Sequence, residues 1–126
     1  MTDILKLAAT EDTPEVYFDV QANEFRLSGR SLPEDAFAFY APIIKWLETY
    51  SQNPSASSVL VISLDYFNSS SVKQLLEIMS VFERLVNVGK DAKIVWCYDT
   101  DDDLMEIKGL EFQSMIANVP FELKAC

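Results

Sequence analysis

The sequence predicts an α/β fold in which about three helices pack on a mixed sheet of four to five strands. Short apolar runs rich in β-branched residues, such as 59–64 and 92–98, alternate with longer segments whose apolar residues recur at helical spacing. Two strands followed by three helix–strand pairs is an order typical of a sheet with right-handed crossovers. At 126 residues, the chain is expected to form a single domain, 1–126.

The first third of the chain contains a predicted hairpin and a predicted helix. Residues 1–13 are polar with a short apolar patch, which suggests a frayed arm or an edge strand. Period-2 alternation from Glu15 to Leu27, interrupted by a turn at 21–23, predicts two paired strands, and Gly29 is expected to end the second. Pro33 fits the first turn of a helix. The apolar side of that helix is predicted to comprise Ala36, Phe37, Tyr40, Ile43, Ile44 and Leu47.

The remaining elements alternate between strand and helix. We predict a central strand at Val59–Leu64, a helix at Ser69–Asn87 and a strand at 92–98. Asp99–Asp103 is expected to open a third helix, and Phe121–Lys124 alternates as a last strand. The second helix is predicted to bury Val72, Leu75, Leu76, Met79, Phe82, Leu85 and Val86 and to expose Lys73, Gln74, Glu77, Ser80, Glu83, Arg84 and Asn87. The third is predicted to face the core with Leu104, Ile107, Leu110 (or Phe112) and Met115.

Composition excludes several classes of function. The chain has no histidine, which removes histidine-based catalysis and most zinc sites. A net charge of −10 argues against nucleic acid and anionic membrane surfaces as partners. Neither phosphate-loop motif occurs, so no cofactor is predicted. Without an apolar span or a signal-like start the chain is expected in the cytoplasm, with Cys97 and Cys126 as free or buried thiols.

An acidic run at 99–106 has carboxylates spaced like the first ligands of a calcium loop. Leu104 and Leu110 stand where such a loop needs Gly and Glu, so the pattern favours a solvated helix start. An alternative is a small Mg²⁺-dependent enzyme that uses Asp65 with Asp99–Asp103.

The strongest functional candidate is the corner between the central strand and the second helix. Asn68, Ser69, Ser70 and Ser71 stand at the helix start, where one of them is expected to cap the backbone N–H groups. The alternative is that a hydroxyl at this positive helix end carries a phosphate. Tyr66 and Phe67 before the corner are either core residues or exposed interface anchors.

The corner resembles a known regulatory motif. A strand ending in Asp or Asn, followed by hydroxyl residues and an amphipathic helix, is similar to the STAS (SpoIIAA-like) fold of anti-sigma-factor antagonists. The segment Leu64–Lys73 is closer to the SiaC family of bacterial regulatory phosphoproteins. Weaker matches follow in the same order along the chain: Thr13-Pro14, Gly29, Pro33-Glu34, Trp46 and Trp96-x-Tyr98-Asp99.

The resemblance implies a non-enzymatic partner switch. The family's phosphoacceptor corresponds to Ser69, with Ser70 and Ser71 as alternatives because Ser replaces the family's Thr. A protein kinase would add the phosphate, and a PP2C-type phosphatase would remove it. The unphosphorylated form would bind and activate a diguanylate cyclase, raising cyclic di-GMP and favouring biofilm or aggregation. Partner contacts are expected from Asp65, Tyr66, Phe67, Asn68 and Lys73. An anti-sigma-factor antagonist with another partner, and a structural subunit or ligand carrier, remain alternatives.

Overall fold

The computed structural model describes residues 3–126 and shows one six-stranded sheet covered by three helices. The strands lie in the sheet in the order of the sequence: β1 (Ile4–Leu7), β2 (Glu15–Asp19), β3 (Glu24–Ser31), β4 (Ser57–Phe67), β5 (Asp91–Tyr98) and β6 (Phe121–Ala125). The helices are α1 (Ala36–Ser51), α2 (Ser69–Asn87) and α3 (Asp103–Met115). None of the described helices is long and apolar enough to cross a membrane.

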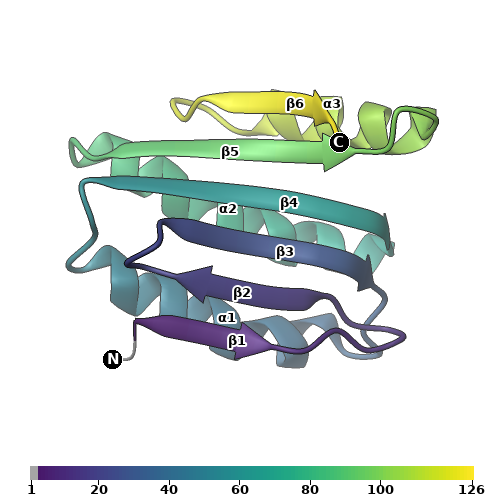
Figure 1. Ribbon diagram of the computed structural model, residues 1–126, viewed down its shortest axis with the longest axis horizontal. Coiled ribbons are helices and arrows are strands. Elements are labelled where there is room, and N and C mark those ends of the chain that lie inside the picture. Colours follow the sequence, from purple (N-terminus) through teal and green to yellow (C-terminus); the bar gives the residue numbers. More distant parts are fainter. Residues whose placement is uncertain (1–2) are drawn as a thin grey trace.

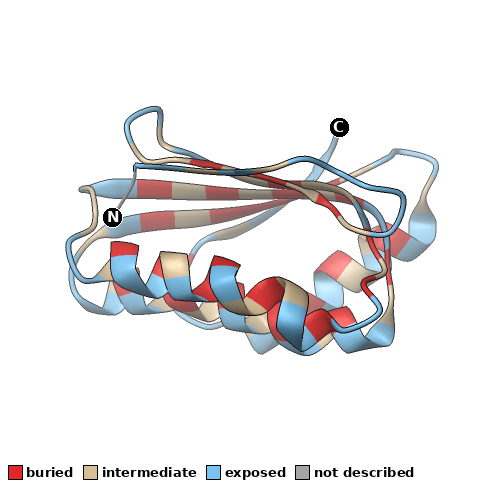
Figure 2. Ribbon diagram, turned by 90° about the horizontal axis from the view of Figure 1, so that it is seen from below, coloured by how far each residue is buried: buried red, intermediate tan, exposed pale blue. Residues whose placement is uncertain are grey.

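All three helices lie on one face of the sheet, as Figures 1 and 2 show. Strands β1, β2 and β3 pair antiparallel, whereas β3 to β6 pair parallel. Each parallel step needs a crossover helix, and crossovers of one hand that all advance in the same direction place their helices on the same side. The carboxyl ends of the parallel strands therefore meet at one edge, where the chain turns into α2 and α3.

The α/β prediction is confirmed, but the strand count is wrong. The sheet has six strands because residues 4–7 pair with β2 as an edge strand, which the sequence left open against a frayed arm. Met1 and Thr2 of that segment lie outside the described residues. Gly29 does not end its strand: it takes a positive φ of 105° at a shift in the β3–β4 register, and pairing continues to Ser31.

Two details of α1 differ from prediction. Pro33 lies before the helix, which begins at Ala36 after an N-cap by Asp35, whose side chain accepts a hydrogen bond from Ala38 N–H. Phe37 was expected in the core but is 72% exposed. The core side of α1 instead follows Tyr40, Ile43, Ile44, Leu47 and Tyr50, a spacing that points Phe37 away from the sheet.

The bounds of α2 match the prediction, while α3 is rotated relative to it. On α2 the one polar residue on the wrong side is Gln74, which is buried rather than exposed. The core side of α3 is Met105, Gly109 and Phe112. Phe112, which was predicted as the alternative to Leu110, is buried as expected. The other residues predicted to face the core are each at least half exposed: Leu104, Ile107, Leu110 and Met115.

Gly109 explains how α3 docks. A β-carbon at this position would overlap Trp96 Cδ1 and lie 2.7 Å from Trp96 Nε1. The missing side chain therefore lets the helix backbone approach the indole, whose N–H donates to the Met105 carbonyl over 2.9 Å. Gly109 lowers helix propensity but is required for packing.

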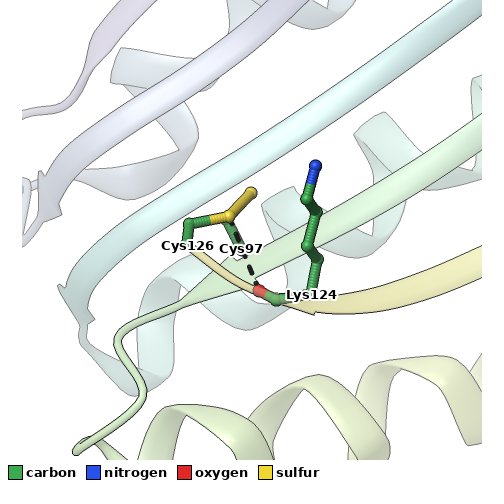
Figure 3. Close-up of a disulfide and its surroundings, with 3 residues drawn as sticks. All are labelled: Cys97, Lys124 and Cys126. Carbon is green, nitrogen blue, oxygen red and sulfur yellow. Dashed lines mark hydrogen bonds between the residues drawn. A yellow bond between two sulfur atoms is a disulfide. The ribbon is translucent and has the colours of Figure 1, made fainter.

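The expectation of free or buried thiols is wrong, because Cys97 and Cys126 form a disulfide (Figure 3). Lys124 pairs with Cys97 across parallel strands β5 and β6, so Cys126 extends just beyond the last pair. The Cα atoms are 5.5 Å apart, within the usual range for a bridge. The bond ties the last residue of the chain to the strand that precedes α3.

Candidate functional site

The corner between β4 and α2 is capped by Asn68 rather than by a serine. Asn68 has an extended backbone, and its side-chain oxygen accepts a hydrogen bond from Ser71 N–H at 3.2 Å. Its own N–H donates to the Ser31 carbonyl at 3.0 Å, which extends the β3–β4 connection by one bond. The capping role expected for this segment therefore belongs to Asn68, and the three serines differ in what they do.

Ser71 belongs to a buried chain of hydroxyl groups. It is fully buried, and its Oγ lies 2.7 Å from Asn68 Oδ1 and 2.8 Å from Ser31 Oγ. Ser31 Oγ in turn lies 2.6 Å from the Tyr40 hydroxyl. Asn68 Oδ1 can only accept, so every donor is satisfied when Tyr40 donates to Ser31, Ser31 to Ser71, and Ser71 to Asn68.

The row of hydrogen-bonded hydroxyl groups joins three elements beneath the corner. Tyr40 comes from α1, Ser31 from the end of β3 and Ser71 from α2. Burial raises the pKa of Tyr40 to about 12, although the hydrogen bond with Ser31 opposes the shift. Local sequence patterns do not reveal the roles of Ser31 and Tyr40. The sequence hints at them only because each carries a hydroxyl group on a side of its element that is otherwise apolar.

Ser69 and Ser70 are exposed, unlike Ser71. Ser70 Oγ donates to Asn68 Oδ1 at 3.0 Å, so it adds to the cap from outside. Within residues 3–126 the Ser69 hydroxyl has no hydrogen-bond partner. It stands at the first residue of α2, where the backbone N–H groups of the first turn are not used by the helix itself.

The expected partner-contact residues separate into surface and core. Asp65, Tyr66 and Lys73 are exposed, with Tyr66 at 49%. Phe67 is only 8% exposed and packs edge-on against Trp96, with their ring centroids 6.0 Å apart. Phe67 therefore anchors the corner to the hydrophobic core.

A hollow of about 500 Å³ opens beside Ser69. It lies between the β4–α2 corner and α3. Its walls are formed by Tyr66, Phe67, Asn68, Ser69 and Val72 at the corner and by Leu104 and Lys108 on α3. Lys73 follows Ser69 by four residues, so the two lie on the same side of α2. A group attached to the Ser69 hydroxyl would thus have apolar walls and two lysines nearby.

The acidic run forms the start of α3, as expected. Asp99 Oδ1 accepts from Asp101 N–H at 3.0 Å, and Asp102 Oδ1 caps the helix through Met105 N–H at 3.1 Å. Asp65, Asp99, Asp101 and Asp102 line a second hollow of about 380 Å³. Among residues 3–126, no group of three or more potential ligand side chains is arranged to hold a metal ion.

Comparison with known proteins gives a consistent result along almost the whole chain. A family model described as SiaC family regulatory phosphoprotein matches residues 7–126. An uncharacterized protein of Pseudomonas aeruginosa strain UCBPP-PA14 is 26% identical over 121 residues, which cover 96% of this chain and 95% of that protein.

Solved structures agree with the family model. The crystal structure of apo-SiaC from Pseudomonas aeruginosa is similar with a TM-score of 0.89, at 26% identity over 98% of this chain and all of that one. A chain in the crystal structure of diguanylate cyclase SiaD in complex with its activator SiaC, also from Pseudomonas aeruginosa, is similar with a TM-score of 0.90, at 26% identity over 97% and 99% of the two chains. This chain therefore belongs to the SiaC family of regulatory phosphoproteins.

Proposed function

We propose that this chain is a partner-switching regulator, that Ser69 is its phosphoacceptor and that its unphosphorylated form binds and activates a diguanylate cyclase. Family membership over residues 7–126 is the observation that carries the proposal. In support, one solved relative is a SiaC protein bound to the diguanylate cyclase SiaD as its activator. The STAS-like fold that the sequence suggested is part of this proposal.

Exposure favours Ser69 among the three serines. A kinase must bring ATP to the hydroxyl, and the Ser71 hydroxyl is enclosed by Ser31 and Asn68. Ser70 is accessible but already donates to the capping oxygen of Asn68. Ser69 is exposed and unengaged, so its modification leaves the cap and the buried hydroxyl chain intact. Ser70 is the remaining alternative.

A phosphate on Ser69 would change the surface without unfolding the domain. It adds a charge of about −1.5 to −2 at the positive end of α2, where free N–H groups favour an anion. The chain as a whole already carries −10. Lys73 and Lys108 are the nearby cations that can pair with the new group. A partner that contacts Asp65, Tyr66, Asn68 and Lys73 would then meet a dianion in the middle of its contact surface.

The switch needs two further proteins, a kinase and a PP2C-type phosphatase. Both act on the same exposed hydroxyl and therefore compete with the cyclase for this corner. We place the switch in the cytoplasm, where the kinase has access to ATP. Its output is then set by the ratio of phosphorylated to free Ser69.

Phosphopeptide mapping tests the acceptor. Incubating the chain with the kinase encoded in the same genome and ATP should add one phosphate to the peptide that contains Ser69. Ser69→Ala should abolish the modification, while Ser70→Ala should retain it. Modification that persists in Ser69→Ala at full extent would refute Ser69 as the site.

A cyclase assay tests the output. The unphosphorylated chain should raise cyclic di-GMP synthesis by the diguanylate cyclase of its own organism, and the phosphorylated chain should not. Ser69→Asp should weaken activation, with Ser69→Ala as the control that retains it. Equal activation by the phosphorylated and unphosphorylated forms would remove the switch from the proposal.

A further inference from the structure

Strand β6 stands at the edge of the sheet, with β5 as its neighbour on one side (Figure 1). Cys126 N–H donates to the Tyr98 carbonyl of β5 at 2.9 Å. Pro120, just before the strand, accepts from β5 through its carbonyl, also at 2.9 Å. The even-numbered residues therefore bond inward, and backbone groups of the odd-numbered ones point away from the sheet. These outward residues are Phe121, Leu123 and Ala125.

The outer edge of β6 is held ready for a further strand. An exposed strand edge is a template for pairing with another chain. Within residues 3–126, no other strand pairs with this edge. At its beginning, Gln113 Nε2 donates to the outward Phe121 carbonyl at 2.9 Å, and at its end the disulfide ties Cys126 to Cys97. The strand is thus fixed at both ends, which reduces the entropy lost when a second strand is added.

The charges of β6 complement each other in one antiparallel register. Glu122 and Lys124 flank Leu123 and are both exposed on the face of the sheet opposite the helices. Glu122 contacts Lys93 at 2.6 Å, whereas Lys124 has no acidic partner within residues 3–126. If two copies of β6 pair about a two-fold axis at Leu123, Glu122 of each copy stands directly opposite Lys124 of the other. Opposite charges in such cross-strand positions favour pairing.

Neighbouring registers bring like charges together. The odd-numbered residues carry the outward groups, so an odd residue of one copy must pair with an odd residue of the other. A shift to the next register in one direction places Glu122 opposite Glu122, and a shift in the other direction places Lys124 opposite Lys124. Like charges directly opposite each other are destabilising. The charge pattern therefore selects the register centred on Leu123.

Helix α3 lies where it can add a second contact. A β-carbon on Gly109 would overlap Trp96 of β5 and lie 3.0 Å from Leu123 Cδ2 of β6, so the helix runs over the gap between these strands. In a sheet joined through β6, the two copies of α3 would stand two strand spacings apart, or about 9.5 Å. Helices that pack against each other are separated by about 8–10 Å. The two copies of α3 would therefore be in contact.

Leu110 is the apolar side chain placed for this contact. It is 51% exposed and precedes Gln113 by three residues, so it lies on the side of α3 toward the outer edge of β6. Its neighbour Gly109 lies against Leu123, which puts Leu110 close to the two-fold axis. At such an axis a residue meets its own copy.

We propose that β6 pairs antiparallel with β6 of a second copy about a two-fold axis at Leu123, which joins two six-stranded sheets into one and packs Leu110 against its counterpart. The inference goes beyond the proposed function and does not depend on it. Strand β4 is two places away from β6 in the sheet, so the β4–α2 corner stays free in the dimer. Each dimer thus presents two corners.

Sedimentation velocity of the full chain at increasing concentration tests for the dimer. Wild type should convert reversibly from monomer to dimer. Lys124→Glu places glutamates opposite each other and Glu122→Lys places lysines opposite each other, so each should raise the dimer Kd about 10-fold or more. Lys45→Glu makes the same charge change at an exposed position of α1, and its Kd should stay within about twofold of wild type.

An equimolar mixture of the two edge variants tests the register. In a mixed dimer, the native Glu122 of one variant faces the native Lys124 of the other, and the two introduced side chains form a second pair of opposite charge. The mixture should therefore dimerise at concentrations at which each variant alone is monomeric. A mixture that stays monomeric would refute the register.

Amide hydrogen exchange followed by NMR tests the backbone pairing. The N–H groups of Leu123 and Ala125 should exchange more slowly as concentration rises, whereas that of Cys126, already bonded within the sheet, should not change. Leu110→Ala should raise the Kd several-fold, and near-ultraviolet circular dichroism checks that each variant keeps its fold. A chain that is monomeric at its highest soluble concentration overturns the proposal, as does a dimer that Lys124→Glu leaves unchanged.

Discussion

Helices α2 and α3 begin in the same way but are held in the fold by different means. Each follows the carboxyl end of a parallel strand, and each is capped by an Asx side chain, Asn68 or Asp102. Helix α2 lies against α1 and the centre of the sheet and buries eight residues. Helix α3 covers the sheet edge, buries three and leaves a row of apolar side chains in solvent.

The difference shows where the core of this domain is deep and where it is thin. The α1–α2 half has a continuous core, with Phe25 in ring contact with Phe18, Tyr50 and Phe82. The α3 half has a thinner core around Trp96 and is closed by the disulfide. Helix α3 is thinly buried and leaves apolar side chains exposed, whereas α2 packs against both α1 and the sheet and carries the β4–α2 corner.

Removing the disulfide should show the largest effect if α3 depends on it. The bridge closes a loop with a sequence separation of 29 that contains α3 and β6. By chain entropy, closing a loop of about 30 residues stabilises a fold by about 3–4 kcal/mol. Cys97→Ser with Cys126→Ser should lower the free energy of unfolding by up to that amount in urea titration. A loss below about 0.5 kcal/mol would mean that packing alone holds this half.

Deprotonation of Tyr40, which lies between α1 and the sheet, should lower the free energy of unfolding at high pH. Its pKa is raised from 10.0 to about 12 by burial. Between these values the unfolded chain releases the proton while the folded chain keeps it, so stability present below pH 10 is lost as pH rises toward 12. At about 1.4 kcal/mol per pKa unit the loss approaches about 2–3 kcal/mol.

Tyr40→Phe provides the control for this pH effect. The variant lacks the ionisable hydroxyl, so its free energy of unfolding should fall less steeply between pH 10 and 12 than that of wild type. Urea titrations at several pH values in this window measure both slopes. Parallel slopes would show that Tyr40 ionises equally easily in both states.

Gly109→Ala tests the docking of α3 at its closest point. Alanine is the better helix former, so propensity alone predicts a gain of about 1 kcal/mol. The added methyl group would collide with Trp96, and overpacking typically costs about 1–3 kcal/mol. We expect a net loss of up to about 2 kcal/mol in urea titration. The control is Ser114→Ala, at an exposed position of the same helix, which should change stability by less than about 0.5 kcal/mol. A gain in stability for Gly109→Ala would contradict close packing between α3 and Trp96.

The same contrast decides what could be predicted from the sequence. Helix α2 has a strong difference between its apolar and polar sides, so its bounds and half of its eight buried residues were predicted correctly. On α3 the core side includes Gly109, which carries no apolar side chain, while the exposed side carries Leu104 and Ile107. The hydrophobic pattern therefore indicated the wrong side.

Long-range pairings were beyond the reach of local patterns. Ser31 and Ser71 are 40 residues apart, and their contact depends on how β3 and β4 align. The disulfide similarly depends on the β5–β6 register, which brings Cys126 next to the end of β5. The motif at residues 64–73 was informative about the family because its residues are neighbours in the sequence and need no long-range pairing to be recognised.

Ser71→Ala and Ser70→Ala form the finest test of the corner. The first removes the link between Ser31 and Asn68 from a fully buried site, and leaving a buried hydroxyl without its acceptor costs about 1–2 kcal/mol. The second removes an exposed bond to the same Asn68 oxygen, which Ser71 still satisfies, so less than about 0.5 kcal/mol should be lost. Urea titration of both variants gives the difference directly. Equal losses would mean that the cap, and not the buried chain that ties α2 to β3 and α1, fixes the position of the corner.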